Sequence, residues 1–212
     1  MRVVSVQVGR VQTLARPGGP ERTAIDKRPT GGPVRATAIG LEGDETCDRV
    51  HHGGPDRAVL FASRATYPVF EARLARPLPF GSFGENLTVE GLTDADVCIG
   101  DRLRAGDAEF EVSSPRSPCG TLARHLGDPG AVDAIGAPHR AGWYARVVRE
   151  GRVGAGADLA LLARPHPGFT VARVAAARRD PRATAAECLA IAALPELAAP
   201  WIEKMRTKAN GA

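Results

Sequence analysis

Glycine and proline interrupt the chain so often, up to about residue 163, that only short elements fit between them. The 212 residues include 24 glycines and 17 prolines. Between the interruptions, polar and apolar residues alternate and β-branched side chains are frequent, a pattern that predicts strands. We expect loops at 17–20 and 29–33, and strands within 3–8, 11–14, 34–41, 58–62, 87–89, 102–105, 109–113, 143–149 and 159–162. Many short strands joined by Gly-rich turns are typical of a closed or nearly closed β-barrel.

Helices are expected within 63–75 and 120–126, and again at the end of the chain. Beyond residues 164–168 the sequence becomes rich in alanine, and its pattern predicts helices over 170–178, 184–193 and 199–208. Thr184 and Glu187 form a capping box at the start of the second of these. We therefore expect a mainly β protein with added helices: a barrel domain at 1–163 and a small three-helix appendage at 164–212. The appendage is short for a core of its own and is expected to dock on the barrel.

The charge balance favours a small anionic ligand over a polymer. Basic residues number 28 and acidic residues 24, which gives a formal net charge of +4, and nearly all the basic residues are arginine. Arginine binds phosphate bidentately, so a small anionic ligand accounts for the surplus at least as well as nucleic acid does. Basic and aromatic residues do not interleave as they do in base-stacking proteins, and we expect no nucleic-acid partner.

The sequence predicts a cytoplasmic protein with no membrane segment. No uncharged apolar run approaches the ~18–20 residues that span a bilayer. The first nine residues alternate like a strand, unlike a signal peptide. Four cysteines, at positions 47, 98, 119 and 188, form no CxxC pair. They are expected to stay reduced in this compartment.

Cys119 is the cysteine with the strongest functional context. It follows the stiff Ser113-Ser-Pro-Arg-Ser-Pro118 turn and precedes an expected helix, whose N-terminus would favour a thiolate. Arg116 adds positive charge nearby. Such a thiol suits a nucleophile, a redox thiol or a soft metal ligand. The alternative is a buried small hydrophobe, which is the common fate of a free cysteine.

Three other motifs contain residues that bind or orient ligands. The His52-Gly-Gly-Pro-Asp-Arg57 loop could offer backbone N–H groups and a cation to an anion, or be only a charged turn. His51 and His52 point in opposite directions as neighbours, which argues against a shared metal. Glu85 and Asn86 close a turn before a strand. The acidic turn Gly40-Leu-Glu-Gly-Asp-Glu45 could position a base or simply be solvated.

Taken together, these motifs resemble a known family, the MOSC domain, named for the C-terminal domain of molybdenum cofactor sulfurase. The nearest branch is the stand-alone bacterial type linked to resistance to 6-N-hydroxylaminopurine, which also carries a C-terminal three-helix appendage. His51 departs from the residues common at its position, whereas His52 matches the family histidine. The resemblance covers nearly the whole chain and rests on the ordered segments 40–45, 52–58, 83–87, 91–92, 99–101 and 114–119.

The resemblance implies a β-barrel cleft that holds the molybdenum cofactor, with Cys119 as the protein ligand to molybdenum. Cations and backbone donors would bind the phosphate and pterin of the cofactor, and Glu85 or Asn86 could contact the pterin or orient the substrate. Arg116, His52 and Glu85 are the candidates for proton delivery. The residues expected to contact the cofactor are Lys27, His52, Gly53, Gly54, Asp56, Arg57, Asn86, Ser114, Arg116 and Cys119.

The implied activity is reduction of a small N-hydroxylated compound to an amine, which consumes two electrons and two protons. The sequence contains no flavin or iron–sulfur motif, so the electrons would come from a separate flavin or iron–sulfur reductase. An alternative is a carrier of the cofactor or of activated sulfur, with Cys119 as a persulfide site. A structural domain with a degenerate site is a third reading, and a homodimer is one option for assembly.

Overall fold

The computed structural model describes every residue except 17–18, 49–52, 138–139 and 212. Its largest sheet has eight strands in the order β13-β9-β10-β11-β7-β8-β1-β4. Every neighbouring pair is antiparallel except β7 and β8, which run parallel. The strands are β1 (Arg2–Val8), β4 (Arg28–Pro29), β7 (Val59–Ser63), β8 (Leu87–Glu90), β9 (Arg102–Ala105), β10 (Ala108–Pro115), β11 (Trp143–Arg149) and β13 (Leu159–Ala163).

The sheet rolls up without closing into a complete barrel. Backbone hydrogen bonds from Val3 to Ala157 and from Leu159 to Met1 join the start of β1 to the first residue of β13 and the residues just before it. The outer edges of β13 and β4 do not pair with each other. The mainly β class with added helices is confirmed, and the expected closure is incomplete. Two small sheets complete the β structure: β12 (Gly151–Val153) with β5 (Val34–Thr37) and β6 (Gly40–Leu41), and the hairpin of β2 (Gln12–Arg16) and β3 (Gly19–Thr23).

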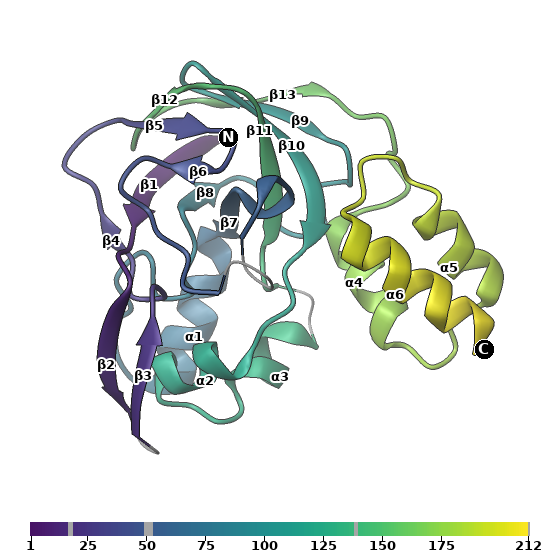
Figure 1. The fold of residues 1–212 in the computed structure, drawn as a ribbon, viewed down its shortest axis with the longest axis horizontal. Coiled ribbons are helices and arrows are strands. Elements are labelled where there is room, and N and C mark those ends of the chain that lie inside the picture. The colour runs from purple at the N-terminus through teal and green to yellow at the C-terminus, as the bar shows by residue number, and fades with distance from the viewer. Residues whose placement is uncertain (17–18, 49–52, 138–139, 212) are drawn as a thin grey trace.

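Two groups of helices cover different parts of the sheet (Figure 1). The first group contains α1 (Tyr67–Leu74), α2 (Gly120–Leu126) and α3 (Ala131–Gly136). Two short 3₁₀ turns, η1 (Pro55–Arg57) and η2 (Arg64–Thr66), precede α1 in the sequence. The second group is the C-terminal block of α4 (Val171–Arg179), α5 (Ala185–Ala192) and α6 (Ala199–Asn210), which lies beside β10 in Figure 1. The Thr184 hydroxyl accepts a hydrogen bond from the Glu187 backbone N–H at 3.1 Å, as the capping box predicts.

Five elements differ from the sequence-based expectation, and one of them is β12, which pairs with β5 where no strand was expected. β3 and β4 lie where loops were expected, because each pairs with a strand that supplies the missing hydrogen bonds: β2 for β3 and the end of β1 for β4. The expected strand 34–41 is divided by a turn into β5 and β6. Gly40 there has φ +137°, a backbone conformation that glycine adopts most readily. The short helix α3 gave no helical period long enough to predict it.

A continuous apolar core joins the sheet to the C-terminal helices. On the sheet side, the Phe61 ring stacks on Trp143 at 5.8 Å and meets the edge of Phe110 at 5.3 Å. The same buried cluster includes Val174 of α4 and Ile191 of α5, both fully buried. The division after residue 163 therefore stays a prediction, since β13 ends there but the core does not.

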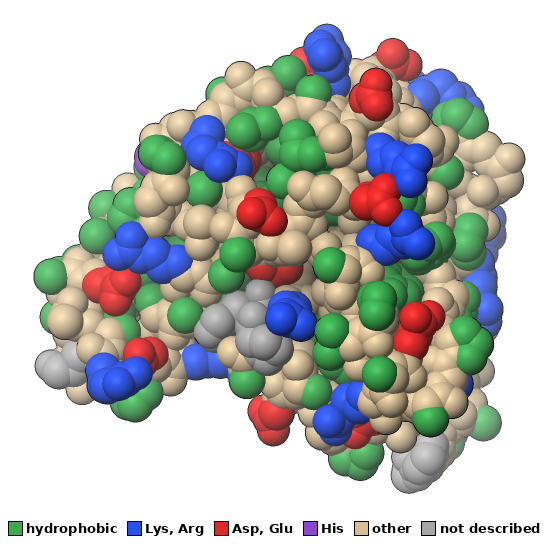
Figure 2. Space-filling model, turned by 180° about the vertical axis from the view of Figure 1, so that it is seen from behind, with side chains coloured by type: hydrophobic (Ala, Val, Ile, Leu, Met, Phe, Trp, Pro, Cys, Tyr) green, Lys and Arg blue, Asp and Glu red, His purple; other side chains and the backbone are tan. Residues whose placement is uncertain are grey.

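Charged side chains of both signs are interspersed over the face seen in Figure 2. Many form surface ion pairs, such as Arg2 and Arg64 on either side of Glu90. Among the described residues, no helix is both long and apolar enough to cross a bilayer.

The shared core predicts that a cavity made in α5 destabilises the whole chain. Ile191→Ala removes a fully buried side chain and should lower the free energy of unfolding by ~2–5 kcal/mol. Leu189→Ala, on the exposed side of the same helix, should change it by less than ~0.5 kcal/mol. Urea unfolding followed by circular dichroism and by tryptophan fluorescence measures both. Two separate transitions in the wild type would contradict a single core.

Candidate functional site

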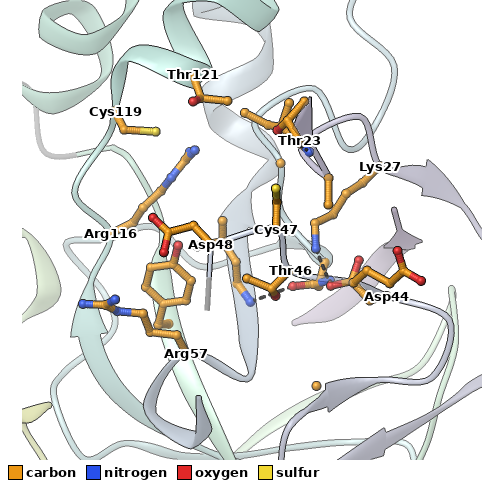
Figure 3. A pocket seen from close by; sticks show the side chains of 18 of the residues that line it. Thr23, Lys27, Asp44, Thr46, Cys47, Asp48, Arg57, Arg116, Cys119 and Thr121 are labelled. Atoms are coloured by element: carbon orange, nitrogen blue, oxygen red, sulfur yellow. Dashed lines mark hydrogen bonds and ion pairs between the residues drawn. The ribbon is translucent and has the colours of Figure 1, made fainter. Parts of the chain in front are cut away.

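A cavity of about 230 Å³ lies between the sheet, the β2–β3 hairpin and the start of α2 (Figure 3). Its lining comes from parts of the sequence that are far apart. The tip of the acidic turn and residues near β4 form one side, and the segment that leads from β10 into α2 forms the other. The charged and thiol groups on the wall include Lys27, Asp44, Cys47, Arg57, Arg116 and Cys119.

Cys119 is the N-cap residue of α2 and presents a partly exposed thiol to the cavity. Two prolines in the preceding segment restrict its backbone. The Arg116 backbone N–H donates to the carbonyl of Gly142 at 2.9 Å, which anchors the turn to the start of β11. A stiff, anchored turn holds the sulfur in one place, as a metal ligand or nucleophile requires.

Arg116 is a buried cation of the cavity wall. The residue is only 7% exposed, and its side chain extends between Cys119 and Cys47 in Figure 3. Its Nη1 atom is buried and has no hydrogen-bond partner among the described residues. Burying an arginine donor without a partner costs free energy. An acceptor placed beside the thiol would supply the partner that this atom lacks.

A buried network around Asp44 forms the opposite wall. The Asp44 carboxylate accepts from Lys27 Nζ at 2.5 Å, from Asn86 Nδ2 at 2.8 Å and from the Gly9 backbone N–H at 2.8 Å. The Lys27 and Asp44 side chains are only 10% and 9% exposed. Burial lowers the pKa of Lys27 from its ordinary value, and the neighbouring Asp44 carboxylate opposes that shift.

The β2–β3 hairpin is tied to α2 above Cys119. Glu21 accepts hydrogen bonds from Arg124 Nε at 3.0 Å and from the Thr121 hydroxyl at 2.8 Å. The Arg124 guanidinium is the main cause that lowers the pKa of Glu21 to about 2. Since Arg22 and Thr23 line the cavity, these contacts fix the wall that the hairpin supplies.

Glu85 does not line the cavity, in contrast to its expected contact with pterin or substrate. It is fully buried, and its carboxylate accepts from the backbone N–H groups of Gly81 and Phe83 and from the Thr88 hydroxyl. The Tyr67 hydroxyl donates to it as well. These donors occupy both oxygens, so Glu85 holds the turn before β8 and is enclosed away from any ligand.

Several other expected contacts also lie away from the cavity. Asp56 accepts from Arg146 Nε at 2.7 Å and fixes the η1 turn against β11. Gly54 is exposed with φ +91° and serves the turn, while Ser114 is buried in β10. The residues off the wall are Gly53, Gly54, Asp56, Ser114 and Glu85, and His52 lies outside the described residues.

The structure brings together five expected residues and adds some that the sequence did not single out. Lys27, Arg57, Asn86, Arg116 and Cys119 all line the cavity. The amide of Asn86, however, is used by the protein: Nδ2 donates to Asp44, and Oδ1 accepts from the Leu60 backbone N–H at 3.1 Å.

The additional wall residues supply a second thiol, hydroxyl groups, the Arg22 guanidinium and the carboxylates of Asp44, Glu45 and Asp48. Asp44 belongs to the acidic turn that the sequence left open between a base and a solvated turn. The further polar residues on the wall include Arg22, Thr23, Thr46, Cys47, Asp48, Thr121 and Tyr144. None of these further residues lies in a sequence motif that indicates ligand binding.

Comparisons with known proteins place the chain in a family. The sequence profile of the MOSC domain matches residues 48–160. YflK of Bacillus subtilis (strain 168) is 44% identical over 169 residues, which cover 80% of this chain and 76% of YflK. A protein named Reductase from Gibberella moniliformis is 37% identical over 177 residues, which cover 81% of this chain but 31% of that protein. The crystal structure of YiiM from Geobacillus stearothermophilus matches 98% of both chains with a TM-score of 0.83 and 33% identity.

The Asp44 network predicts a large loss of stability when its acceptor is removed. Asp44→Ala would leave the Lys27 ammonium buried without a counterion, which costs ~3–5 kcal/mol when a buried pair is broken. Glu42→Ala, an exposed change in the same acidic turn, should stay within ~0.5 kcal/mol of wild type. Chemical denaturation of the three proteins measures the difference. Equal stabilities for the two variants would show that the network contributes nothing.

Proposed function

The chain belongs to the MOSC domain family, and from this membership we propose that its cavity binds the molybdenum cofactor with Cys119 as the protein ligand to the metal. The observation that carries the proposal is the partly exposed Cys119 thiol beside the buried Arg116 guanidinium, whose Nη1 lacks a partner among the described residues. A thiolate is a soft ligand suited to such a metal. A cation next to it suits a cofactor that carries a phosphate.

The other wall residues fit the same anionic group. Arginine pairs with phosphate through two parallel hydrogen bonds, so Arg116 would take that role, with Arg57 on the neighbouring wall. The Lys27 ammonium is already paired with Asp44, so it would add only a weaker, longer-range attraction. Asn86 would act indirectly, because its amide holds Asp44 in place.

We propose that the reaction at this site is reduction of a small N-hydroxylated compound. The conversion of R–NHOH to R–NH2 and water takes up two electrons and two protons and breaks the N–O bond. The cofactor, when bound, supplies the two-electron redox chemistry. Cys119 would anchor it and Arg116 would balance its charge. Guanidinium groups are not deprotonated in proteins, Glu85 is enclosed, and His52 lies outside the described residues. Solvent at the open side of the cavity is the proton source that we propose.

The electrons for this reaction would come from a separate reductase. The relative from Gibberella moniliformis is named Reductase, which supports an oxidoreductase role. The matched region makes up only 31% of that protein, so most of its length has no counterpart in this chain. A flavin or iron–sulfur protein that binds near the cavity is the electron donor that we propose for this chain.

The ligand assignment predicts that Cys119→Ser abolishes molybdenum binding and N-hydroxy reduction while leaving the fold intact. Elemental analysis of protein from a cofactor-producing host should give molybdenum near one per chain in wild type and little in the variant. Cys98→Ser, at a buried thiol that lies off the cavity wall, is the matched control and should retain the metal. Metal retained in Cys119→Ser would refute the assignment. Metal bound without turnover of an N-hydroxylated substrate and added reductant would favour the cofactor carrier.

The role proposed for Arg116 predicts a separate effect on how tightly the cofactor is held. Arg116→Gln removes the charge but keeps a polar side chain, and a charge-assisted hydrogen bond contributes ~1.5–3 kcal/mol. Cofactor affinity should therefore fall about 10- to 100-fold, measured as the rate at which molybdenum is lost during dialysis. Arg173→Gln, on the exposed side of α4, serves as the control and should lose the metal at the wild-type rate. Equal loss from both variants and wild type would remove Arg116 from the site.

A further inference from the structure

A second cavity of about 280 Å³ lies between the segment that precedes Cys119 and the C-terminal helices. Of the residues that the structure describes, Arg116 and Ser117 alone line both cavities, so this segment is a wall between them. The polar lining of the second cavity consists of Asp94, Arg116, Ser117, Arg178 and Arg179, beside the Trp201 ring. Among the expected functional residues that the structure describes, Arg116 is the one that belongs to it.

Asp94 is a buried carboxyl group with an unused oxygen. It is only 4% exposed, and its Oδ1 accepts from the Gly142 backbone N–H at 2.8 Å. Oδ2 is buried and has no hydrogen-bond partner among the described residues. Burial raises the pKa of Asp94 to about 7. Leaving a buried acceptor without a donor costs free energy. A ligand in the cavity that donates a hydrogen bond to this oxygen would remove that cost.

Two arginines of α4 supply positive charge on the other side of the cavity. Arg178 Nη1 donates to the Ser117 hydroxyl at 2.8 Å, and its guanidinium lies over the Trp201 ring. The Arg179 guanidinium packs on Gly136 of α3, where a Cβ atom would come within 2.5 Å of its Nη2. The absence of a side chain at Gly136 therefore lets Arg179 reach the cavity wall.

We propose that this second cavity is a binding site for inorganic hydrogen phosphate. Arginine guanidinium groups match the oxygens of a phosphate through paired hydrogen bonds. Above its pKa Asp94 is ionised and only accepts, so under those conditions it requires an anion that still carries a proton. Hydrogen phosphate carries one near neutral pH and donates it to Oδ2. Sulfate and the dianion of a phosphate monoester carry none, and Asp94 repels them.

Binding is tested with the full-length protein and inorganic phosphate by isothermal titration calorimetry. The titrations are run at about pH 8, above the pKa of Asp94, and at constant ionic strength. Arg179→Gln should weaken phosphate binding at least about tenfold, and Gly136→Ala should do the same by displacing the guanidinium. Arg182→Gln, an exposed arginine that pairs with Asp180 outside the cavity, is the matched control and should bind as wild type does. Phosphate binding unchanged in Arg179→Gln would overturn the proposal.

Selectivity tests the role of Asp94 directly. Wild type should bind phosphate at least about tenfold more tightly than sulfate or methyl phosphate. Asp94→Asn replaces the repelling oxygen with a group that can donate, and should gain sulfate binding by a similar factor. Equal affinity for the three anions in wild type would refute the shared proton. The same titration in Cys119→Ser separates this site from the proposed function, because phosphate binding should persist there even if the cofactor assignment fails.

Discussion

The buried Asp44 carboxylate is the interaction on which the wall of the main cavity depends. It gathers hydrogen bonds from the end of β1, from Lys27 before β4 and from Asn86 before β8. Three segments far apart in the sequence thus meet at one charged group. Because a buried carboxylate must keep its donors, these segments cannot shift independently, and the cavity keeps its shape.

The segment from Pro115 to Cys119 has a comparable role on the other side. Its prolines and the Arg116–Gly142 backbone bond make it rigid. It separates two cavities, each lined by a buried polar atom that has no hydrogen-bond partner in the described part of the chain. Arg116 lines both cavities, so a charged group bound in one cavity lies close enough to interact electrostatically with a charged group in the other. The site next to Cys119 and the site next to Asp94 are therefore electrostatic neighbours.

The C-terminal helices are joined to this arrangement by more than apolar packing. Arg146 of β11 donates to Asp56 in η1, to Glu111 in β10 and to the carbonyl of Glu196 between α5 and α6. A single guanidinium thus connects a turn beside the cavity, the sheet and the appendage. This network explains why Asp56, in a motif that suggests ligand binding, is used for structure.

The sequence by itself determined the elements whose signals are local. Alternation and β-branching located most strands, capping residues located α5, and the prolines before Cys119 marked the rigid turn and the start of α2. The ordered motifs identified the family, and Lys27, Arg57, Asn86, Arg116 and Cys119 do line one cavity.

Only the tertiary structure decided which polar residues face a ligand and which face the protein. Glu85 is enclosed by donors from its own turn and from α1, and Asp56 is held by a distant arginine. Asp94 gains its significance from helices that pack beside it from the other end of the chain. Hydrogen-bond partners of this kind are set by long-range packing, so the local pattern that places a carboxylate in a turn does not reveal which groups will surround it.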